Sequence, residues 1–499
     1  MTKPASIHFA VPVWGEQYIE NWLRYSLPCQ LSANNLPAVS ALTQQQSSFA
    51  SNQPVYHIFT TVEGQTQIRA SSLFQRLSIL TTVVFHSLES IQQSCEADRN
   101  LWRKYADNDW KKYAVKMACL TTAMQAAHQS KGVLIPLMSD IFVSDGGFRY
   151  LVEQALTGKK LVLVGSMRAL DVPFLSAMKP YVSTDETLTI SGSALLRHTL
   201  ANLHPQSLKT NRYSAHFNSQ WCDYMYWHQA QVGIIQRGVF CYPFLIDCQT
   251  ELSVPPGYTI DTCPFVDAQT SEQAFEPSEV HVVTSPANCM VMTVSTEDEF
   301  DHVATSPGVF NPLQIATFIH QNSFMHHQEF LRHPVIYGDE SSANMQQLMT
   351  RCEQDYQAVK ASLNFLQQSP GMVEQLSAIA ACQALGDSWL AKIPDAIEQA
   401  LLSSGSKPLY LFGSGVEAQA LLHILPLRQR LSGLIDNDLT RVGQHMYDVA
   451  IVSPDALPEH AVVVCASAKH HEAMQQQLEQ MYQSAITIIN PYIQQGATQ

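Results

Sequence analysis

Charged residues are scarce in this sequence. They make up 14% of its 499 residues, and acidic side chains outnumber basic ones to give a net charge of −14. We therefore do not expect a nucleic-acid partner, because neutralising phosphates requires clustered cations. The eleven cysteines are scattered without a C-x-x-C pair, which favours reduced thiols over a disulfide framework or a structural zinc site.

Long apolar runs are also missing. No segment approaches the roughly 20 uninterrupted apolar residues that a membrane-spanning helix requires. The opening stretch, MTKPASIHFAVPVWGE, lacks the basic start, long apolar core and cleavage site of a signal peptide. We therefore expect a cytoplasmic protein without a transmembrane segment. At about 150 residues per domain, its length allows about three domains with sizeable cores.

What the sequence does contain is an alternation of strand-like and helical stretches, which is typical of a parallel α/β sheet. The first strands are expected at Ile7–Val13, Val55–Thr61, Thr82–His86, Val133–Met138 and Lys160–Gly165. The helices between them are expected at Gln17–Leu31, Ser72–Leu80, Leu101–His128 and Phe148–Thr157. This order predicts a doubly wound sheet that binds ligands at the carboxyl ends of its strands.

Three parts are expected along the chain. Residues 1–300 would form the first α/β body, with an irregular acceptor-binding extension from about Thr187. Residues 301–404 would form a helical connector, because 311–332 and 341–368 have helical patterns. Residues 405–499 would form a second, smaller body. The predicted fold class is thus α/β, with two doubly wound, Rossmann-like bodies joined by a helical segment.

The stretch Ile7–Glu16, IHFAVPVWGE, is a strand ending in a loop that opens a helix, and that helix ends in SLPCQ. It resembles the first strand and loop of GT-A type glycosyltransferases, where a segment of the type VPVYNE holds the nucleotide base. The resemblance implies that a nucleotide sugar is bound by Pro12, Val13, Trp14 and Glu16. The alternative is that any parallel sheet begins this way.

A basic face follows on the expected helix 101–128. Lys112 and Lys116 lie four residues apart and therefore share one face of that helix. In GT-A enzymes a basic helix at this place puts a cation near the diphosphate of the donor, which is the role that the resemblance implies here. The alternative is a solvated basic surface.

The strand VLIPLMSD ends in Asp140, which resembles the strand that carries the Asp-x-Asp motif in GT-A enzymes. In that motif, carboxylates hold Mn²⁺ or Mg²⁺ on the diphosphate, so the resemblance implies one of these ions as cofactor. Met138 and Phe142 stand where a second acid is expected. Asp140 is therefore a candidate for a metal ligand, a ribose ligand or part of a metal-independent site. Arg168, after the next strand, is a candidate for binding phosphate.

An aromatic segment, WCDYMYWH at 221–228, surrounds one acid. Aromatic faces beside a carboxylate suit a sugar acceptor whose hydroxyl is deprotonated by Asp223, with Asp247 and Asp261 as rival bases. The alternative is that these rings belong to the core. Farther on, four histidines lack the i, i+4 spacing of helical metal sites, so we expect no metal there: His320, His326, His327 and His333.

The C-terminal part contains a G-x-G-x-x-A turn at Gly413 and Gly415, between an expected strand and helix. Asp436 ends the next expected strand, 21 residues after Gly415, at the spacing of nucleotide-binding Rossmann folds. The segment resembles small Rossmann-like domains attached to bacterial sugar-modifying enzymes and methyltransferases. We expect a nucleotide bound by Gly413, Gly415 and Asp436, with a purely structural domain as the alternative.

Together these features predict a glycosyltransferase-like enzyme that transfers a sugar from a nucleotide sugar to a glycan or protein acceptor. Two other classes stay open. One is an NAD(P)-dependent oxidoreductase acting through the C-terminal body, although no Tyr-x-x-x-Lys pair follows Asp436. The other is a non-catalytic scaffold, which the missing Asp-x-Asp motif permits.

Overall fold

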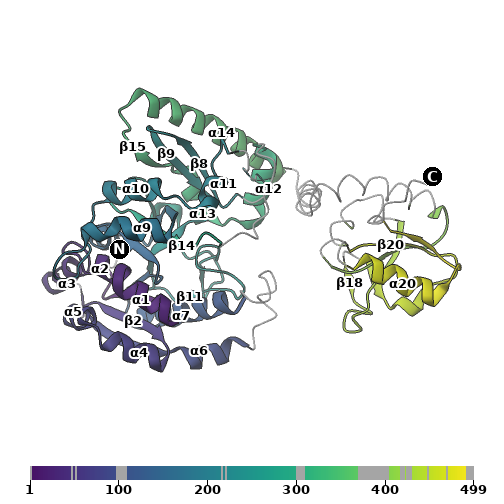
Figure 1. Cartoon of the computed structure of the whole chain (residues 1–499), viewed down its shortest axis with the longest axis horizontal. Helices are drawn as coiled ribbons and strands as arrows, with labels where there is room; N and C mark the ends of the chain where they lie inside the picture. Colours follow the sequence, from purple (N-terminus) through teal and green to yellow (C-terminus); the bar gives the residue numbers. More distant parts are fainter. Residues whose placement is uncertain are drawn as a thin grey trace. The chain divides into compact units, whose positions relative to one another are not determined.

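The computed structural model has two compact units (Figure 1). Unit 1 contains residues 1–310 and 321–357, and unit 2 contains residues 311–320 and 358–499. Both are mixed α/β with parallel strands. The structure describes residues 3–46, 49–50, 53–96, 110–214, 217, 219, 222–298, 310–368, 404–415, 430–446, 449–467 and 470–490, together with 400, 418 and 422.

The main sheet of unit 1 has seven strands in the order β13-β6-β10-β4-β1-β2-β3. The strands span β1 (Ile7–Pro12), β2 (Val55–Thr60), β3 (Thr82–Ser87), β4 (Val133–Pro136), β6 (Leu161–Val164), β10 (Tyr242–Asp247) and β13 (Val280–Val283). All neighbours are parallel except β10, which runs antiparallel to β4 and β6. β1 and β4 are completely buried, and His8 is the one polar side chain in these two strands.

Helices connect these strands. They span α1 (Glu16–Asn21), the π-helical turn η1 (Trp22–Ser26), α2 (Leu27–Gln30), α3 (Leu36–Gln45), α4 (Val62–Arg69), α5 (Ser72–Leu80), α6 (Leu88–Cys95), α7 (Trp110–Gln129), α8 (Gly147–Leu156), α9 (Asp171–Met178), α10 (Gly192–Ala201) and α11 (Pro205–Lys209). α7 packs on β1 and β4, and its expected first part, residues 101–109, lies outside the described residues.

Two three-stranded sheets extend unit 1. One joins β5 (Ile141–Val143), β14 (Val291–Ser295) and β7 (Ser166–Leu170), and the other joins β8 (Tyr224–Gln229), β9 (Gly233–Gly238) and β15 (Val335–Gly338). A short pair, β11 (Leu252–Ser253) and β12 (Val266–Asp267), completes the strands. The region expected to be irregular is therefore ordered by hairpins and by long-range strand pairing.

The segment expected to be a helical connector, 301–404, is not uniformly helical. Its described part contains α12 (Pro312–Asn322), α13 (Met325–Arg332) and α14 (Ala343–Gln368), but also β15. β15 pairs antiparallel with β9 of unit 1, because its apolar residues Val335–Tyr337 are buried there. The last part of this expected connector, residues 369–403, lies outside the described residues except for residue 400.

A row of three histidines crosses the main sheet of unit 1 on β1, β2 and β3. His8 Nδ1 lies 2.9 Å from His57 Nε2, and His57 Nδ1 lies 2.9 Å from His86 Nε2. The other ring nitrogen of His8 is 2.7 Å from Ser130 Oγ. His8 and His57 are 4% and 3% exposed, and burial lowers their pKa values to about 4 and about 3. The row is therefore neutral at pH 7.

Unit 2 contains a six-stranded sheet in the order β18-β19-β17-β16-β20-β21. The strands span β16 (Leu409–Phe412), β17 (Leu431–Ile435), β18 (His445–Met446), β19 (Val449–Val452), β20 (Val462–Cys465) and β21 (Thr487–Ile489), and α20 spans His471–Tyr482. All pairs are parallel except the β18–β19 hairpin. The strand expected before Gly413 and the strand expected before Asp436 are thus present as β16 and β17, whereas most of the helix expected after Gly415 lies outside the described residues.

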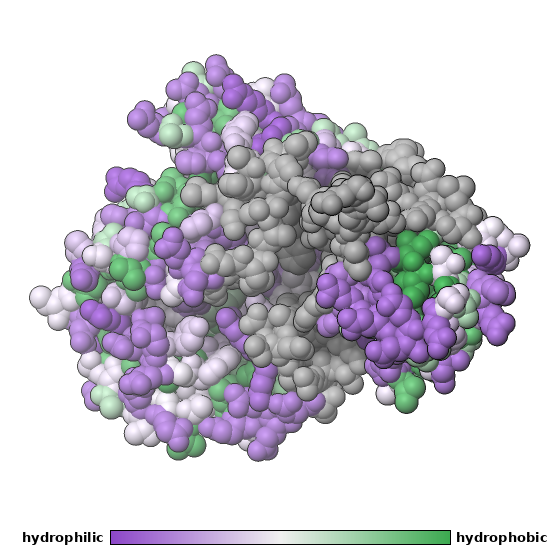
Figure 2. All heavy atoms as spheres, turned by 45° about the vertical axis from the view of Figure 1, so that its right-hand side comes forward, coloured by the Kyte–Doolittle hydropathy of each residue, from purple (hydrophilic) through white to green (hydrophobic). Residues whose placement is uncertain are grey.

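The surface is mixed in character. On the face shown in Figure 2, hydrophobic residues lie in small groups among hydrophilic ones. The most exposed large apolar side chains, which include Val62, Ile79, Val172 and Leu439, belong to separate elements. In the described part of the chain, no helix is both long enough and apolar enough to cross a membrane. The ten described cysteines are buried and carry free thiols.

Candidate functional site

The strand order of unit 1 reverses at β1. The chain leaves β1 to form β2 and β3 on one side, and returns to form β4 on the other. At such a switch point the connections leave in opposite directions, and a crevice opens outside the carboxyl ends of the two central strands. Trp14 and Glu16 follow β1, and Asp140 follows β4. The topology therefore brings both predicted segments to one edge of the sheet.

The four loop residues predicted to bind the donor differ in exposure. Pro12 ends β1 and is buried, and Val13, which is 1% exposed, donates its backbone N–H to Phe59 O at 2.9 Å. Trp14 is half-buried against the core, while Glu16 is exposed in the first turn of α1. Of these four residues, Trp14 and Glu16 are thus the two whose side chains a ligand can reach.

Lys116 lies at this edge on α7. Its Nζ is 3.2 Å from Met138 Sδ, at the end of β4. Burial lowers the pKa of the Lys116 amine, the charge of Asp140 raises it, and the charges of Lys112 and Arg168 lower it. Asp140, Lys112 and Arg168 are thus close enough to Lys116 for their charges to act on its amine, although the four residues come from three separate parts of the chain.

Arg168 lies on β7, where it pairs in register with Thr293 of β14, and its guanidinium donates to Ser295 Oγ. Among the described residues, no group of three His, Cys, Asp or Glu side chains is arranged to hold a metal ion. The site thus offers Asp140 with three cations and not a set of oxygen ligands. The metal role of Asp140 stays a prediction.

Asp223 and Asp261 lie near the same edge, and the charges of both act on Tyr224. Burial raises the pKa of Tyr224 well above its usual range, and the charges of Asp261 and Asp223 raise it further. Tyr242, at the start of β10, has its pKa raised by burial and then by Asp140 and Asp261, and its hydroxyl donates to Pro136 O at 3.3 Å. The charge of Asp261 also raises the pKa of Lys116, so this candidate base lies close to the three cations.

His327 fixes the loop that carries Asp261. This histidine is 1% exposed, and its Nδ1 accepts the backbone N–H of Phe324 at 3.0 Å. Nε2 must therefore carry the ring proton, which it donates to the backbone carbonyl of Asp261 at 3.0 Å. Burial lowers the pKa of His327 to about 4, so this neutral form persists at pH 7.

Asp247 is not part of this group, which corrects the prediction that it is a rival base at the site. β10 is antiparallel to its neighbours, so its last residue, Asp247, pairs with Val133 at the amino end of β4. There its carboxylate accepts the backbone and side-chain N–H groups of Gln249 at 2.7 and 2.9 Å.

The aromatic segment 221–228 does not form a single cluster at the site. Trp227 is buried, and its indole N–H donates to Asp355 at 2.9 Å. Trp221 lies outside the described residues.

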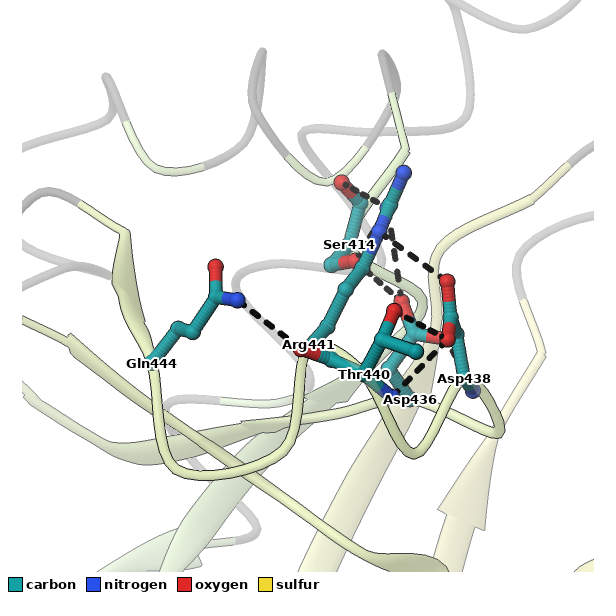
Figure 3. Close-up of polar contacts among 6 residues, drawn as sticks. All are labelled: Ser414, Asp436, Asp438, Thr440, Arg441 and Gln444. Atoms are coloured by element: carbon teal, nitrogen blue, oxygen red, sulfur yellow. Dashed lines mark hydrogen bonds and ion pairs between the residues drawn. The ribbon is translucent and has the colours of Figure 1, made fainter.

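A second candidate site lies in unit 2, at the carboxyl end of β16. There the order also reverses, since β17 and β19 lie on one side of β16, and β20 and β21 on the other. Gly413 has φ +114°, and a Cβ added there would lie 3.2 Å from Ala466 O. At Gly415, an added Cβ would meet no heavy atom of the described residues within 4 Å. Ser414, between the two glycines, donates its hydroxyl to Asp436 (Figure 3).

Gly413→Ala is expected to destabilise unit 2 by about 1–3 kcal/mol, because Ala disfavours a positive φ and its Cβ would crowd Ala466 O. Gly415→Ala is the matched control, since its added Cβ meets open space. Hydrogen exchange in β16 and β20 measures the difference. Equal protection in both variants would show that Gly413 has no special backbone role.

The chain matches no family model, and no curated protein matches it. Among solved structures it is similar to mouse xyloside xylosyltransferase 1 in its apo form, with a TM-score of 0.24 and 14% sequence identity. The match covers 35% of this chain and 58% of the mouse protein, so the chain spans little more than half of that protein's length. A TM-score this low does not establish a shared fold.

Proposed function

We propose that unit 1 is a glycosyltransferase that moves a sugar from a nucleotide sugar to a hydroxyl of a glycan or protein acceptor. The observation that carries the proposal is the convergence of Lys112, Lys116 and Arg168 with Asp140 at the β1/β4 switch point. Three cations at a strand-end crevice suit a ligand with two phosphates, and an adjacent carboxylate suits hydroxyl groups of a sugar or ribose.

In this proposal the cations serve the departing nucleotide. Breaking the bond between the sugar and the diphosphate leaves negative charge on the phosphate oxygens, and fixed cations in a partly buried site stabilise that charge. Lys116 is well suited to this role, because it is partly buried and its ammonium gains from a nearby anion. Trp14 and Glu16 would contact the nucleoside from the neighbouring loop.

The acceptor would lie on the side of Asp223 and Asp261. A carboxylate there removes the proton of the acceptor hydroxyl as it attacks the sugar carbon. Asp261 is the stronger candidate, because its loop is fixed by His327 and its charge acts on both Lys116 and Tyr242. Asp223 remains the second candidate, and its backbone carbonyl is held by the N–H groups of Val239 and Phe240.

A direct test is a thermal-shift panel of UDP, GDP, CMP and their sugar conjugates, with and without Mn²⁺. Stabilisation by one nucleotide family, together with slow release of that nucleotide from its sugar conjugate in water, would support the proposal. If no member of the panel shifts the melting temperature of the full-length protein, unit 1 is not a nucleotide-sugar enzyme.

Lys116→Met is expected to weaken binding of the nucleoside diphosphate about tenfold or more, since one charge-assisted contact to phosphate is lost. The free energy of unfolding of this variant is expected to equal or exceed that of the wild-type protein, because an apolar side chain replaces an amine whose charged form burial disfavours. Isothermal titration and urea unfolding measure the two quantities. Lys111→Met is the control, because Lys111 is exposed and paired with Glu96 at 2.9 Å. Equal weakening in both variants would remove Lys116 from the site.

A further inference from the structure

The small sheet of β8, β9 and β15 has one face on α14 and the other on the main sheet of unit 1 (Figure 1). On the first face, Arg237 of β9 donates to the carboxylate of Glu353 on α14. Gln236 precedes Arg237 and points the opposite way, because successive side chains of a strand alternate. It is 0% exposed, and its amide lies against Gly165, the residue that follows β6. The small sheet thus puts a buried amide at the end of β6.

This amide is hydrogen-bonded through its oxygen alone. The Oε1 atom of Gln236 accepts the hydroxyl of Tyr337 at 2.9 Å. Its Nε2 atom is enclosed, and it has no hydrogen-bond partner among the described residues. A buried donor without a partner costs free energy, which an apolar side chain of similar size would avoid. The unused donor therefore points to a ligand oxygen.

Gly165 is what allows the amide to lie so close to the strand end. A Cβ at this residue would lie 2.4 Å from Gln236 Oε1 and 2.8 Å from the hydroxyl oxygen of Tyr337. Any larger residue would therefore displace the amide. β6 runs in the same direction as β4, because β10 lies between them and is antiparallel to both. The amide and Asp140 consequently lie at the same edge of the main sheet.

Tyr226 connects this amide to the predicted cations. It pairs in register with Gln236, and its hydroxyl donates to Ser166 O at 3.3 Å. Burial raises the pKa of Tyr226, and the charge of Arg168 lowers it. Gln236 is thus next to a tyrosine that lies within the field of Arg168.

We propose that Gln236 binds a hydroxyl group of the sugar that unit 1 transfers, and that this sugar is uncharged. The inference rests on the glycosyltransferase function proposed above. In the main sheet, β6 lies three strand spacings from β1, or about 14 Å. A donor with its nucleoside at the loop after β1 and its diphosphate beside Asp140 therefore extends its sugar towards Gly165 and Gln236. The enclosed amide has to turn to reach the sugar, and turning breaks no hydrogen bond of Nε2 with the described residues.

The absence of charge on the sugar follows from the acids nearby. The charges of Asp140 and Asp261 act on Lys116, and the charge of Asp223 acts on Tyr226. Together with a bound diphosphate, these three carboxylates outnumber the three cations. A uronate or a sialate would add another negative charge in a partly buried place, where like charges repel strongly. An amide donor and an uncharged hydroxyl meet no such repulsion.

The test is a calorimetric titration of the full-length protein with bare nucleotides and their sugar conjugates. The panel contains UDP, GDP, CMP, UDP-glucose, UDP-N-acetylglucosamine, GDP-mannose, UDP-glucuronate and CMP-sialate. The wild-type protein is expected to bind one of the uncharged conjugates at least about tenfold more tightly than either charged one. Gln236→Leu should weaken binding of that conjugate about three- to tenfold, since one hydrogen bond is lost. The affinity of the same variant for the bare nucleotide should stay at the wild-type value.

Two further variants accompany Gln236→Leu. The double variant Gln236→Leu/Tyr337→Phe removes both partners of the buried hydrogen bond, so it should fold even if the single variant does not. It should show the same selective loss of affinity for the conjugate. Gln125→Leu exchanges an amide for an apolar group at an exposed position of α7, and should leave both affinities unchanged.

The possible outcomes separate this inference from the function on which it rests. The inference alone is overturned if a conjugate binds but the folded Gln236 variants keep wild-type affinity for it, or lose affinity for the conjugate and the bare nucleotide equally. It is also overturned if UDP-glucuronate or CMP-sialate binds most tightly. If the wild-type protein binds no member of the panel, the glycosyltransferase function fails, and this inference fails with it.

Discussion

Asp140→Asn is expected to weaken binding of the donor nucleotide sugar by about ten- to a hundredfold while unit 1 stays folded. Two losses combine. The carboxylate no longer accepts hydrogen bonds from the ligand, which costs about 1.5–3 kcal/mol. In addition, Lys116 loses the neighbouring charge that raises its pKa, so a smaller fraction of its amines is protonated.

The loss of the Asp140 charge should also change how donor affinity depends on pH. Donor binding that needs a protonated Lys116 declines as pH rises through the pKa of that amine. Without Asp140 this pKa is lower, so the decline should begin at lower pH in Asp140→Asn than in the wild-type protein. Titrations between pH 6.5 and 9.5 measure the shift. The effects of Asp140→Asn and Lys116→Met should also be less than additive.

Asp247→Asn supplies the comparison, since Asp247 lies at the opposite edge of the same sheet. It is expected to change stability but leave donor affinity unaltered, because its carboxylate accepts hydrogen bonds from the backbone and side chain of Gln249 at that opposite edge. If Asp140→Asn retains wild-type affinity and pH dependence, Asp140 has no part in donor binding.

The second large effect is a loss of stability of unit 1 in mild acid. The folded-state pKa values of His8, His57 and His327 are about 4, 3 and 4, against an ordinary value of 6.5. The pKa of His326 is also well below that value, because the ring is buried beside His327. As pH falls below 6.5, the unfolded chain binds protons that these folded rings cannot accept. Stability is therefore full above pH 6.5 and is lost progressively towards pH 4 and below.

The expected magnitude is several kcal/mol. A pKa lowered from 6.5 to about 4 corresponds to about 3 kcal/mol for one histidine once pH has fallen below both values. Urea unfolding of unit 1 at pH 7.5, 6, 5 and 4.5 measures the loss.

The variant His57→Phe, which replaces the central ring of the row, should make the free energy of unfolding depend less steeply on pH. It also lowers stability at pH 7.5, because it breaks two hydrogen bonds. His460→Gln, an exposed site in unit 2, should not alter the slope. A flat profile from pH 7.5 to 4.5 would contradict the neutral burial of these rings.

Much of unit 1 follows from local sequence. The expected strands from Ile7, Val55, Thr82, Val133 and Lys160 match β1, β2, β3, β4 and β6 to within two residues at either end. β4 and β6 consist of apolar residues alone, and such sequences predict burial on both faces, which is typical of strands in parallel sheets. Parallel strands present their carboxyl ends at one edge of the sheet. The sequence alone therefore predicts that Asp140 and the loop after β1 lie at the same edge.

The parts that were not predicted depend on strand direction and on distant contacts. Nothing local distinguishes an antiparallel β10 from a parallel strand, so Asp247 was expected at the wrong edge and Tyr242 was not expected at the site. Similarly, the bond from His327 to Asp261 joins residues 66 positions apart. The spacing of the histidines excluded a metal motif, but it could not reveal that one of them supports a loop.

The reversed strand β10 also dictates the order in which unit 1 assembles. In the described sheet, β6 and β13 connect to β4 solely through β10, which is made long after β6. In a nascent chain, strands β1, β2, β3 and β4 can therefore pair early. β6 stays unpaired until residues 242–247, which form β10, leave the ribosome. If synthesis stops between these segments, β4 has one open edge and β6 has no partner strand, and such exposed apolar strands are prone to aggregation. Unit 1 should consequently tolerate truncation poorly, and chaperone dependence during synthesis should end when β10 emerges.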